Sequence, residues 1–317
     1  MNLLFELSGE NQPLAAAEIS CAGNVTRTEN GIAIAEVNDP DRTTRLAQTH
    51  VVMRLLGECD ASKEDLERLL DSLALTAPGR FCCRVRKIHP VTVNASQLEL
   101  ERMMGQKIHG TVDLNTPDVE YRAVFTNGRC FFGEVLHTID RGSYAYRNPQ
   151  RRAFFHPGVM MPLMARTMVN LTHVEPGERL CDPFCGTGGM LLECEMMGIE
   201  AVGSDYDPEM LIGCRQNLPN GACIRADATK MPYPDEAFDA IATDLPYGQS
   251  TTIGAESIDT LYTESLKEIR RVLKRGGRAV IVTHKDIRPL AKDLFEIVGY
   301  YEQRVHKSLT RRILILA

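Results

Sequence analysis

The sequence lacks several features that mark whole classes of protein. It contains no run of about 18 or more apolar residues, so no segment is typical of a membrane-spanning helix. Its opening residues include Glu6 and Glu10 and no basic residue, so we expect no secretory signal and a cytoplasmic protein. None of its 10 cysteines forms a Cys-x-x-Cys pair, which predicts reduced, buried thiols and no zinc site within the chain. No internal repeat or low-complexity tract is evident.

An excess of positive charge is also missing, although nucleic-acid-binding proteins usually carry one. The net charge is −6, but it is unevenly distributed. Residues 1–77 carry 6 Lys and Arg against 13 Asp and Glu, and residues 153–317 carry 18 against 22. Residues 78–152 carry 12 against 7, a local charge of +5. The total charge therefore does not exclude a nucleic-acid partner, because the surplus of basic residues lies in the middle of the chain.

The length and composition indicate two ordinary globular domains. A chain of 317 residues is about twice the usual domain size of ~150 residues, and 44% hydrophobic with 25% charged residues is a normal globular balance. A segment that combines Gly, Ser, Asn and Pro with four arginines separates the two halves. We therefore expect domains over residues 1–140 and 153–317, joined by a linker over residues 141–152.

The first domain mixes strands and helices without regular alternation, which predicts an α+β fold. Asn127-Gly128 between two β-prone segments is a strong signal for a two-residue hairpin. Ser62 followed by Asp65 indicates a capped helix. The expected strands are residues 3–7, 31–37, 81–88, 119–126 and 129–136, and the expected helices lie at 13–21, after Ser62 and at 96–104.

The second domain alternates strands with helices from about Met160, which is the pattern of a parallel sheet covered on both faces. The last two strands leave no room for a crossover helix, so we expect them to form an antiparallel hairpin at the end of an α/β sheet. The seven expected strands are residues 179–181, 201–204, 222–226, 240–243, 279–283, 301–305 and 312–316.

The most informative segment is a glycine-rich loop within residues 180–191, LCDPFCGTGGML. A strand ends in Asp182, the chain turns through three glycines and a helix follows, which offers backbone N–H groups to a ligand at the carboxyl edge of the sheet. The Asp182 carboxylate would repel a pyrophosphate but suits a cationic ligand without phosphates. Taken alone, such a loop is equally consistent with a plain tight turn.

Two further acidic residues end the next two strands. Asp205 follows Asp182 by about 23 residues, a spacing at which a carboxylate accepts hydrogen bonds from ribose hydroxyls. Asp227 ends the third strand, where its side chain could accept from an adenine amino group. Any one of these residues would more commonly cap a helix or a turn, but together they favour a nucleoside site.

A compact recognition motif, Asp244-Leu245-Pro246-Tyr247, follows the fourth strand. A purine amino group is a poor nucleophile, because its lone pair is delocalised into the ring. The Asp244 carboxylate and the backbone carbonyl of Leu245 or Pro246 could hold both amino hydrogens and turn the nitrogen toward a methyl donor. Tyr247 could stack on the flipped base, which is worth about 1–3 kcal/mol in single-strand binders. The plain alternative is a β-turn with a tyrosine that caps the core.

These motifs resemble those of S-adenosylmethionine-dependent methyltransferases with a seven-stranded Rossmann-like sheet, over roughly residues 160–317. The resemblance implies that S-adenosylmethionine is the cofactor. It also implies that Asp182 helps to hold the methionine ammonium, Asp205 binds ribose and Asp227 contacts adenine. The remaining cofactor contacts that we expect are Pro183, Cys185, Gly186, Thr187, Gly188, Tyr206, Ala228 and Asp244.

The segment at residues 244–247 is similar to the (Asp/Asn/Ser)-Pro-Pro-Tyr motif of methyltransferases that act on exocyclic amino groups. The implied catalytic residues are Asp244, Pro246 and Tyr247, and Leu245 departs from the motif by replacing its first proline. Asp rather than Asn at the first position is more typical of guanine-N2 enzymes than of glutamine enzymes.

Two flanking segments narrow the resemblance to archaeal tRNA guanine-N2 methyltransferases that modify the guanosine near position 10. They are RRAFFHPG at residues 151–158 and HKSLTRR at residues 306–312. We interpret His156 and His306 as hydrogen-bonding or substrate-positioning residues rather than general bases. The proton lost from a methylated ammonium is acidic enough for Asp244 or water to take.

The basic segment lies in a region that resembles a THUMP RNA-binding domain preceded by a ferredoxin-like unit. Residues 112–118, VDLNTPD, are similar to the family's Asp-Leu-x-x-Pro-Asp segment. The resemblance implies that this region grips the acceptor end of tRNA by its backbone shape and sets the distance to the target base. A solvated surface is an equal alternative from the residues alone. The expected substrate contacts are Arg80, Arg84, Arg86, Lys87, Arg152, Phe155 and His156.

The sequence thus predicts a tRNA methyltransferase that transfers methyl from S-adenosylmethionine to guanine N2, at position 10 by family resemblance. One alternative keeps the chemistry but changes the substrate to another tRNA or rRNA guanosine or to an adenine N6 amino group. Another is a non-catalytic RNA-binding protein with a degenerate methyltransferase fold, which the intact motifs disfavour. Some members of the family use a small zinc-binding activator protein. The sequence does not decide that point, the oligomeric state, or whether one or two methyl groups are added.

Overall fold

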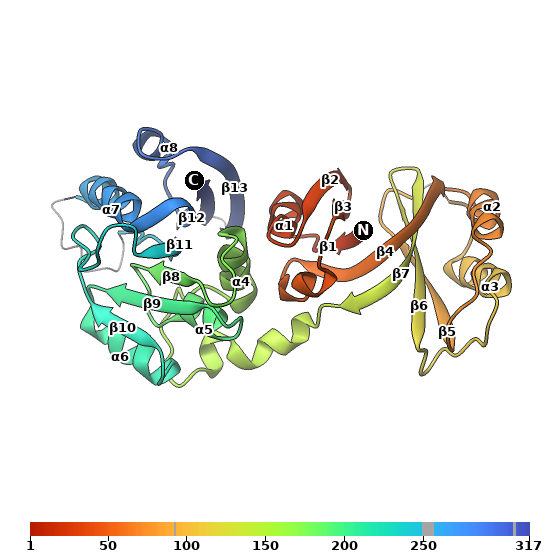
Figure 1. The fold of residues 1–317 in the computed structure, drawn as a ribbon, viewed down its shortest axis with the longest axis horizontal. Helices are drawn as coiled ribbons and strands as arrows, with labels where there is room; N and C mark the ends of the chain where they lie inside the picture. Colours follow the sequence, from red (N-terminus) through yellow and green to blue (C-terminus); the bar gives the residue numbers. More distant parts are fainter. Residues whose placement is uncertain (92, 249–256, 307–308) are drawn as a thin grey trace. The chain divides into compact units, whose positions relative to one another are not determined.

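The computed structural model describes residues 1–91, 93–248, 257–306 and 309–317. Within these ranges the chain forms two compact units, each with its own seven-stranded sheet (Figure 1). The first unit comprises Met1–Thr44 and Gln48–Asp140, and the second comprises Arg45–Ala47 and Arg141–Ala317. No helix in the described ranges is both long and apolar enough to cross a membrane.

The sheet of the first unit has the order β2-β3-β1-β4-β7-β6-β5, and only β5 and β6 pair in parallel. Five of its strands confirm the sequence prediction, and Asn127 and Gly128 form the expected hairpin turn with positive φ angles. The strands are β1 (Asn2–Leu7), β2 (Asn24–Glu29), β3 (Ile32–Glu36), β4 (Thr49–Asp60), β5 (Phe81–Lys87), β6 (Val119–Thr126) and β7 (Arg129–Thr138).

The sequence does not predict β2 or β4, although β4 is the middle strand of this sheet and runs for 12 residues. The register of β4 against β7 shifts between Val52 and Met53 and again between Leu55 and Gly57. The first shift leaves an extra residue in β7, whereas the second leaves Leu56 as an extra residue in β4 and interrupts the period-two alternation of its side chains. The sequence of β4 therefore shows no continuous strand pattern.

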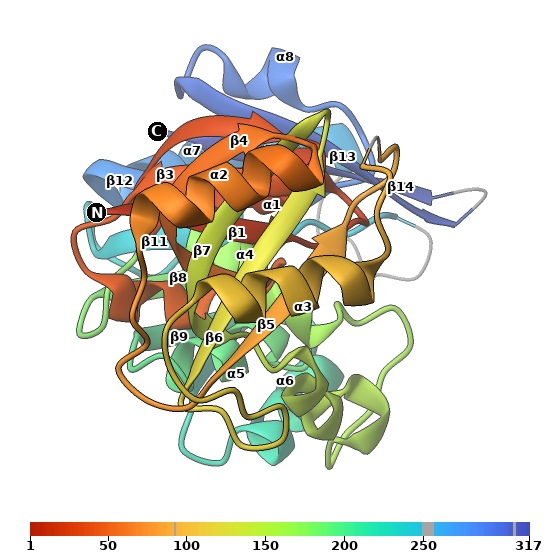
Figure 2. The same cartoon turned by 90° about the vertical axis from the view of Figure 1, so that its right-hand side faces the viewer.

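Two helices cover one face of the first sheet, as Figure 2 shows with α2 and α3 in front of the strands. They are α2 (Lys63–Leu73), which begins after the predicted Ser62 cap, and α3 (Gln97–Lys107). Their apolar side chains, such as Leu70 and Met104, share a buried cluster with Phe81 and Phe132. The remaining helices are α1 (Gln12–Ile19) and the 3-10 helix η1 (Pro40–Arg45).

The sheet of the second unit has the order β10-β9-β8-β11-β12-β14-β13. The first five strands in that order are parallel, and β14 is antiparallel to both β12 and β13. All seven expected strands and the terminal hairpin are therefore confirmed. They are β8 (Arg179–Asp182), β9 (Glu200–Asp205), β10 (Ala222–Arg225), β11 (Phe238–Asp244), β12 (Leu273–Thr283), β13 (Ile297–His306) and β14 (Leu309–Leu316).

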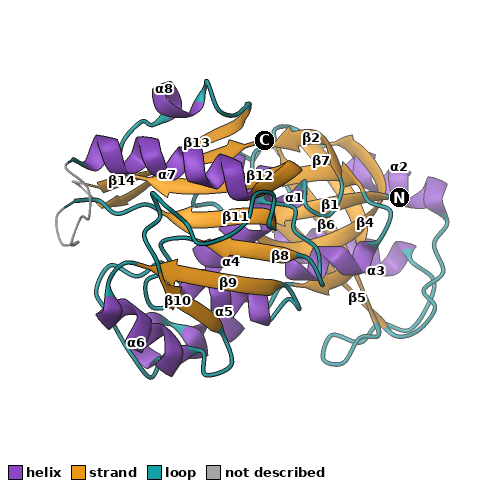
Figure 3. Ribbon diagram, turned by 60° about the vertical axis from the view of Figure 1, so that its left-hand side comes forward, coloured by secondary structure: helices purple, strands orange, loops and turns teal. Residues whose placement is uncertain are grey.

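Helices cover both faces of this sheet (Figure 3). Apolar residues of α7 and α8 share one cluster with Ile241 and Ile281, whereas those of α5 and α6 share a separate cluster with Cys185. All 10 cysteines are free thiols, and all except the half-buried Cys59 are buried, as predicted. The helices are η2 (Arg141–Arg147), η3 (Pro149–Arg151), α4 (Pro162–Leu171), α5 (Gly189–Glu195), α6 (Pro208–Asn217), α7 (Ile258–Val272) and α8 (Arg288–Ala291).

Candidate active site

Four acidic residues follow the carboxyl ends of four adjacent strands in the second unit. Asp182, Asp205 and Asp244 are the last residues of β8, β9 and β11, and Asp227 comes just after β10. Since these strands are parallel and their order is β10-β9-β8-β11, the acids occur along one sheet edge in the order Asp227, Asp205, Asp182, Asp244. The topology thus brings together residues that are more than 60 positions apart, as Asp182 and Thr243 show by a hydrogen bond across 61 residues.

Asp182 is the most deeply buried of these acids, with 3% of its surface exposed. Its Oδ1 accepts hydrogen bonds from the Thr243 hydroxyl at 2.7 Å and from the Phe184 N–H at 3.2 Å. Burial, with a smaller contribution from the charges of Asp205 and Asp244, raises the pKa of Asp182 to about 7 against the opposing effect of these hydrogen bonds. A cationic ligand would relieve this accumulation of negative charge, as the sequence analysis expects for a ligand without phosphates.

The glycine loop holds Asp205 in place. The Gly186 N–H donates to Asp205 Oδ2 at 2.9 Å, and the Asp207 N–H donates to Oδ1 at 2.9 Å. Gly186 has φ +50°, and a Cβ built on it would meet nothing within 4 Å, so the loop presents open space beside this carboxylate. Gly188 differs, because its Cβ would lie only 2.7 Å from Leu218 Cδ1. The first glycine leaves room for a ligand, and the second permits close packing on α6.

Besides Asp182, three predicted cofactor residues of this loop have buried side chains. Pro183 is buried directly after β8, and Cys185 belongs to the apolar cluster of α5 and α6. The side chain of Thr187 is buried as well, and its carbonyl accepts from Asn217 Nδ2 at 3.0 Å. These residues therefore stabilise the conformation of the loop through buried contacts.

The predicted adenine region lies beyond β9 and β10. Asp227 Oδ1 accepts from the backbone N–H and the hydroxyl of Thr229 at 2.8 and 2.7 Å, which fixes the carboxylate. Ala228 is buried, whereas Tyr206 is 42% exposed with the Arg225 guanidinium 5.4 Å from the centre of its ring. Tyr206 is therefore the residue of this region that offers an accessible aromatic face.

Asp244 and Tyr247 form a hydrogen-bonded pair at the end of β11. The Tyr247 hydroxyl donates to Asp244 Oδ1 at 2.8 Å, and Arg311 contacts both residues. Arg311 Nε donates to the Tyr247 oxygen at 3.3 Å, and its Nη2 lies 4.0 Å from Asp244 Oδ2. Burial raises the pKa of Asp244 to about 6, while the Arg311 charge and the tyrosine hydrogen bond oppose that rise. The carboxylate is thus mainly ionised near neutral pH.

The structure gives a physical reason for Leu245, which replaces the first proline of the motif. The Leu245 N–H donates to the Val282 carbonyl at 2.9 Å, a bond that proline could not make. Its side chain is 2% exposed and belongs to the core beneath α7 and α8. The Pro246 carbonyl accepts from the Tyr262 hydroxyl at 2.6 Å. The loop is therefore anchored by one backbone hydrogen bond, one buried side chain and one tyrosine.

Arg311, His284 and Tyr262 are neighbours of this site that the sequence analysis did not single out. The Tyr247 and His284 rings lie 5.0 Å apart at 49°, and burial lowers the pKa of His284 with help from Lys285 and Arg312. Because β14 is antiparallel to β12, with Arg312 opposite Thr283, the start of β14 lies at the carboxyl edge of the sheet. Arg311 belongs to the predicted terminal hairpin. Its position beside Asp244 and Tyr247 follows only from the pairing of β14 with β12.

The predicted substrate residues of the second unit occupy different environments. Phe155 is 49% exposed and His156 is half-buried. The terminal guanidinium nitrogens of Arg152 are buried and have no hydrogen-bond partner among the described residues. The segment at residues 306–312 is described only in part, because Lys307, Ser308 and the side chain of His306 lie outside the described residues.

The predicted RNA contacts of the first unit do not share one face. On β5, Phe81, Cys83 and Val85 face α2 and α3, so Arg84 and Arg86 project from the opposite face while Lys87 projects toward the helices. Lys87 donates to the Ala95 carbonyl and Arg84 to the Leu114 carbonyl at 3.3 Å. Arg80 precedes the strand and is paired with Asp113 and Asp118. Arg84 and Arg86 therefore project from the same face of the sheet. Neither has a carboxylate partner among the described residues.

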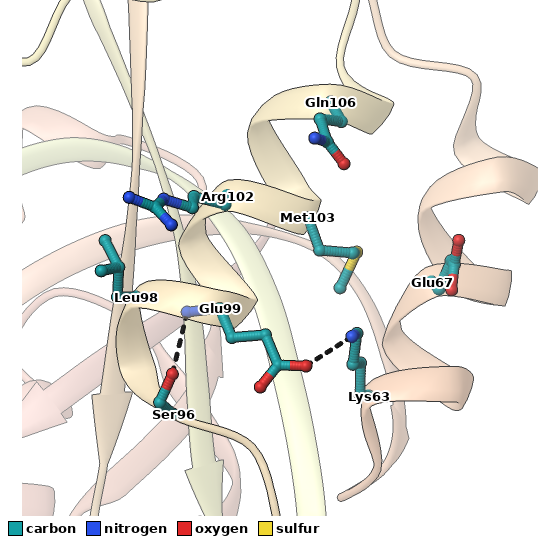
Figure 4. A pocket seen from close by; sticks show the side chains of 8 residues that line it. All are labelled: Lys63, Glu67, Ser96, Leu98, Glu99, Arg102, Met103 and Gln106. Atoms are coloured by element: carbon teal, nitrogen blue, oxygen red, sulfur yellow. Dashed lines mark hydrogen bonds and ion pairs between the residues drawn. The ribbon is translucent and has the colours of Figure 1, made fainter.

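A polar cavity of about 380 Å³ lies between α2 and α3 (Figure 4). The Lys63 ammonium and a Glu99 carboxylate oxygen form an ion pair of 2.5 Å beside it, and the Glu99 N–H donates to the Ser96 hydroxyl. None of the predicted substrate residues lines this cavity. The lining residues are Lys63, Glu67, Ser96, Leu98, Glu99, Arg102, Met103 and Gln106.

Comparison with known proteins agrees with this arrangement. Residues 149–313 match the family model described as UPF0020: RMKL-like, methyltransferase domain. The chain is 34% identical to the tRNA (guanine(10)-N2)-dimethyltransferase of Methanothermobacter thermautotrophicus, over 100% of this chain and 99% of that protein. It is 32% identical to the Pyrococcus abyssi protein of the same description, over 98% of each. The crystal structure of TrmN from Thermus thermophilus shares the fold with a TM-score of 0.53 at 22% identity, over 100% of this chain and 99% of that one.

Proposed function

The chain belongs to the tRNA guanine-N2 methyltransferase family, whose methyl donor is S-adenosylmethionine, and we propose that it dimethylates the N2 amino group of guanosine 10 in tRNA. The observation that carries the proposal for this site is the group of Asp244, Tyr247 and Arg311 at the carboxyl edge of β11, beside the buried Asp182. An ionised acceptor and an aromatic ring lie next to a buried carboxyl group that favours a cation. An amino-group methyl transfer needs these two neighbouring environments.

The acids of β8, β9 and β10 fit the cofactor. When bound, S-adenosylmethionine supplies a methyl group that its sulfonium has already activated. The buried Asp182, whose pKa burial raises to about 7, gains a counter-charge if it holds the methionine ammonium. Asp205, which the glycine loop orients through the Gly186 N–H, accepts from the ribose hydroxyls. Asp227 accepts from the adenine amino group, and the exposed Tyr206 flanks the adenosine.

Asp244 holds the guanine amino group in this proposal. Its carboxylate accepts one amino hydrogen, and the Leu245 carbonyl is the backbone acceptor for the other, because the Pro246 carbonyl already accepts from Tyr262. With both hydrogens held, the nitrogen lone pair turns toward the methyl group. Orientation then supplies much of the rate, because the methyl group needs no further activation.

Arg311 and Tyr247 keep Asp244 ready for this role. The Arg311 charge lowers the pKa of a carboxyl that burial alone would raise further, so the acceptor stays ionised. The half-buried Tyr247 ring lies 5.0 Å from the His284 ring, and in this proposal its exposed surface stacks on the base. After methyl transfer the nitrogen is positively charged and acidic, and Asp244, which holds the amino group in this proposal, takes its proton.

We assign tRNA binding to the first unit, as a ferredoxin-like and THUMP region over residues 1–140. The support is the shared outward projection of Arg84 and Arg86 from β5, neither of which has a carboxylate partner among the described residues. A cytoplasmic location is part of the same proposal.

Radiolabelled methyl transfer to a tRNA transcript, followed by nucleoside analysis, tests the function. We expect N2,N2-dimethylguanosine from a transcript with guanosine at position 10 and no label when that guanosine is replaced by adenosine. The control is a transcript with a guanosine replaced elsewhere in the same stem. If methyladenosine were the only product, or if the label survived replacement of guanosine 10, the substrate assignment would be wrong.

A further inference from the structure

Three arginines surround a single buried glutamate beside the glycine loop. Arg147 Nε donates to Glu193 Oε1 at 2.7 Å, and Arg166 Nε donates to Oε2 at 2.8 Å. Glu193 is fully buried, and the two arginine side chains are 5% and 8% exposed. Arg152 is close enough to interact electrostatically with both Glu193 and Arg147. One carboxylate thus faces three guanidinium groups, so this cluster carries an excess of positive charge.

Arg152 is the member of the cluster without a carboxylate of its own. Its Nε donates to the Arg147 carbonyl at 2.9 Å, but Nη1 and Nη2 are buried and have no acceptor within the described part of the chain. Buried charged donors are almost always paired, because leaving them unpaired costs several kcal/mol. Glu193 already has two guanidinium partners, so Arg152 is not needed to neutralise the Glu193 carboxylate.

The unpaired guanidinium lies directly on the glycine loop. A Cβ built on Gly189, which is the first residue of α5, would be 3.4 Å from Arg152 Nη1 and 3.9 Å from Nη2. Asn217 connects the segment that follows Arg152 to the same loop through hydrogen bonds. Its Oδ1 accepts from the Phe154 N–H at 2.9 Å, and its Nδ2 donates to the carbonyls of Phe154 and Thr187 at 3.1 and 3.0 Å. Arg152 is therefore held at the loop and does not extend into solvent, in contrast to the exposed Arg151.

We propose that the Arg152 guanidinium binds the carboxylate of the methionine portion of S-adenosylmethionine. This inference rests on the proposed function, and it moves Arg152 from the expected RNA contacts to the cofactor site. The amino-acid end of the cofactor carries one positive and one negative group. Asp182 precedes the glycine loop and suits the ammonium, and Arg152 lies where the loop enters α5 and offers a planar pair of donors that matches a carboxylate. The guanidinium nitrogens are covered, so the carboxylate must displace part of that cover as it binds.

Isothermal titration calorimetry on the full chain without tRNA tests the assignment, with S-adenosylmethionine and its decarboxylated analogue as a matched pair of ligands. For Arg152→Gln we expect S-adenosylmethionine to bind about 10- to 100-fold more weakly, which is the effect of losing a charged hydrogen-bond partner. The decarboxylated analogue should bind the variant and the unmodified protein equally well. Arg151→Gln, at the exposed neighbouring position, is the control and should bind both ligands normally.

Two results would overturn the assignment. Equal weakening of both ligands would make Arg152 a structural residue, and no weakening of either would remove it from the site. If Arg152→Gln does not fold, Arg152→Lys keeps the charge without the planar fork and should still weaken the carboxylate-bearing ligand selectively. Failure of the proposed function is detected separately, because the unmodified protein would then give no methylguanosine in tRNA whatever the calorimetry shows.

Discussion

The two units of the chain use charged side chains in opposite ways. In the first unit Arg80 is paired with Asp113 and Asp118, and these exposed carboxylates have lowered pKa values because Arg80 and nearby backbone groups donate to them. In the second unit Asp182 is buried and Asp244 is half-buried, and the pKa values of both are raised. Charges of the first kind are satisfied within the fold, whereas the second kind are left for a ligand to satisfy. For these four carboxylates, the direction of the pKa shift thus differs between the two units.

The strongest test of this difference is Asp244→Asn. We expect methyl transfer to tRNA to fall by about 10²- to 10⁴-fold, because the amide offers a weaker acceptor and cannot take the proton. Affinity for S-adenosylmethionine, measured by calorimetry, should change by less than about threefold. Asp259→Asn is the matched control, since the Asp259 side chain is 73% exposed and its ion pair within the described ranges is with Lys285 on the surface. Full activity in Asp244→Asn would contradict the amino-group clamp.

The pH dependence of cofactor binding probes the second unit at Asp182. Only the ionised carboxylate attracts the ammonium, and its pKa is about 7 before binding. Affinity for S-adenosylmethionine should therefore fall by up to about tenfold for each pH unit below 7 and level off above 8. Titration at pH 6, 7 and 8 measures the slope. Asp182→Asn should bind weakly at every pH without this slope, and an unchanged slope in that variant would assign the titration to another group.

Arg311→Gln tests the group that opposes the raised pKa of Asp244. Without the Arg311 charge the pKa of Asp244 should rise further above 6, because burial is then less strongly opposed. At saturating cofactor the acidic limb of the rate profile should move to higher pH, with a loss of about tenfold at pH 7 and little loss at pH 9. Lys267→Gln, which removes an exposed ion pair with Glu264, should leave the profile in place. A uniform loss at every pH would mean that Arg311 acts on Tyr247 alone.

Thermal unfolding of the unliganded protein compares the two kinds of carboxylate directly. The folded pKa of Asp182 lies above its unfolded value, so its ionisation opposes folding and the penalty grows as pH rises from about 4 to about 7. Asp182→Asn should accordingly stabilise the second unit at pH 8, by about 1–3 kcal/mol, and the gain should vanish near pH 4. Asp118→Asn should do the opposite, since the lowered pKa of Asp118 stabilises the folded state above its unfolded pKa. If both variants were less stable than the unmodified protein at pH 8, Asp182 and Asp118 would not differ in their effect on folding.

The sequence predicts the second unit better than the first for a physical reason. Each strand of a parallel sheet is short and apolar and ends at the same edge, so Asp182, Asp205 and Asp244 could be placed together from their positions at strand ends alone. The central strand β4 was missed because an extra residue, Leu56, interrupts its alternation. Arg311 was not placed at the site, because strand pairing brings it there, and Arg152 was expected to contact RNA, because only the charge balance around Glu193 points to the cofactor instead. Neither cause leaves a local sequence pattern.

The smallest effects belong to single basic residues on β5. Arg84 and Arg86 project from the sheet face opposite α2 and α3 and have no carboxylate partner among the described residues, so each is available to a phosphate. Arg84→Gln and Arg86→Gln should each weaken tRNA binding a few-fold and reduce the slope of log affinity against log salt by about 0.7–0.9. Arg129→Gln should do neither, because Arg129 is paired with Asp60 and Glu58. If Arg129→Gln reduced the slope equally, paired arginines would also release counterions on binding, and pairing within the fold would no longer separate structural from RNA-binding charge.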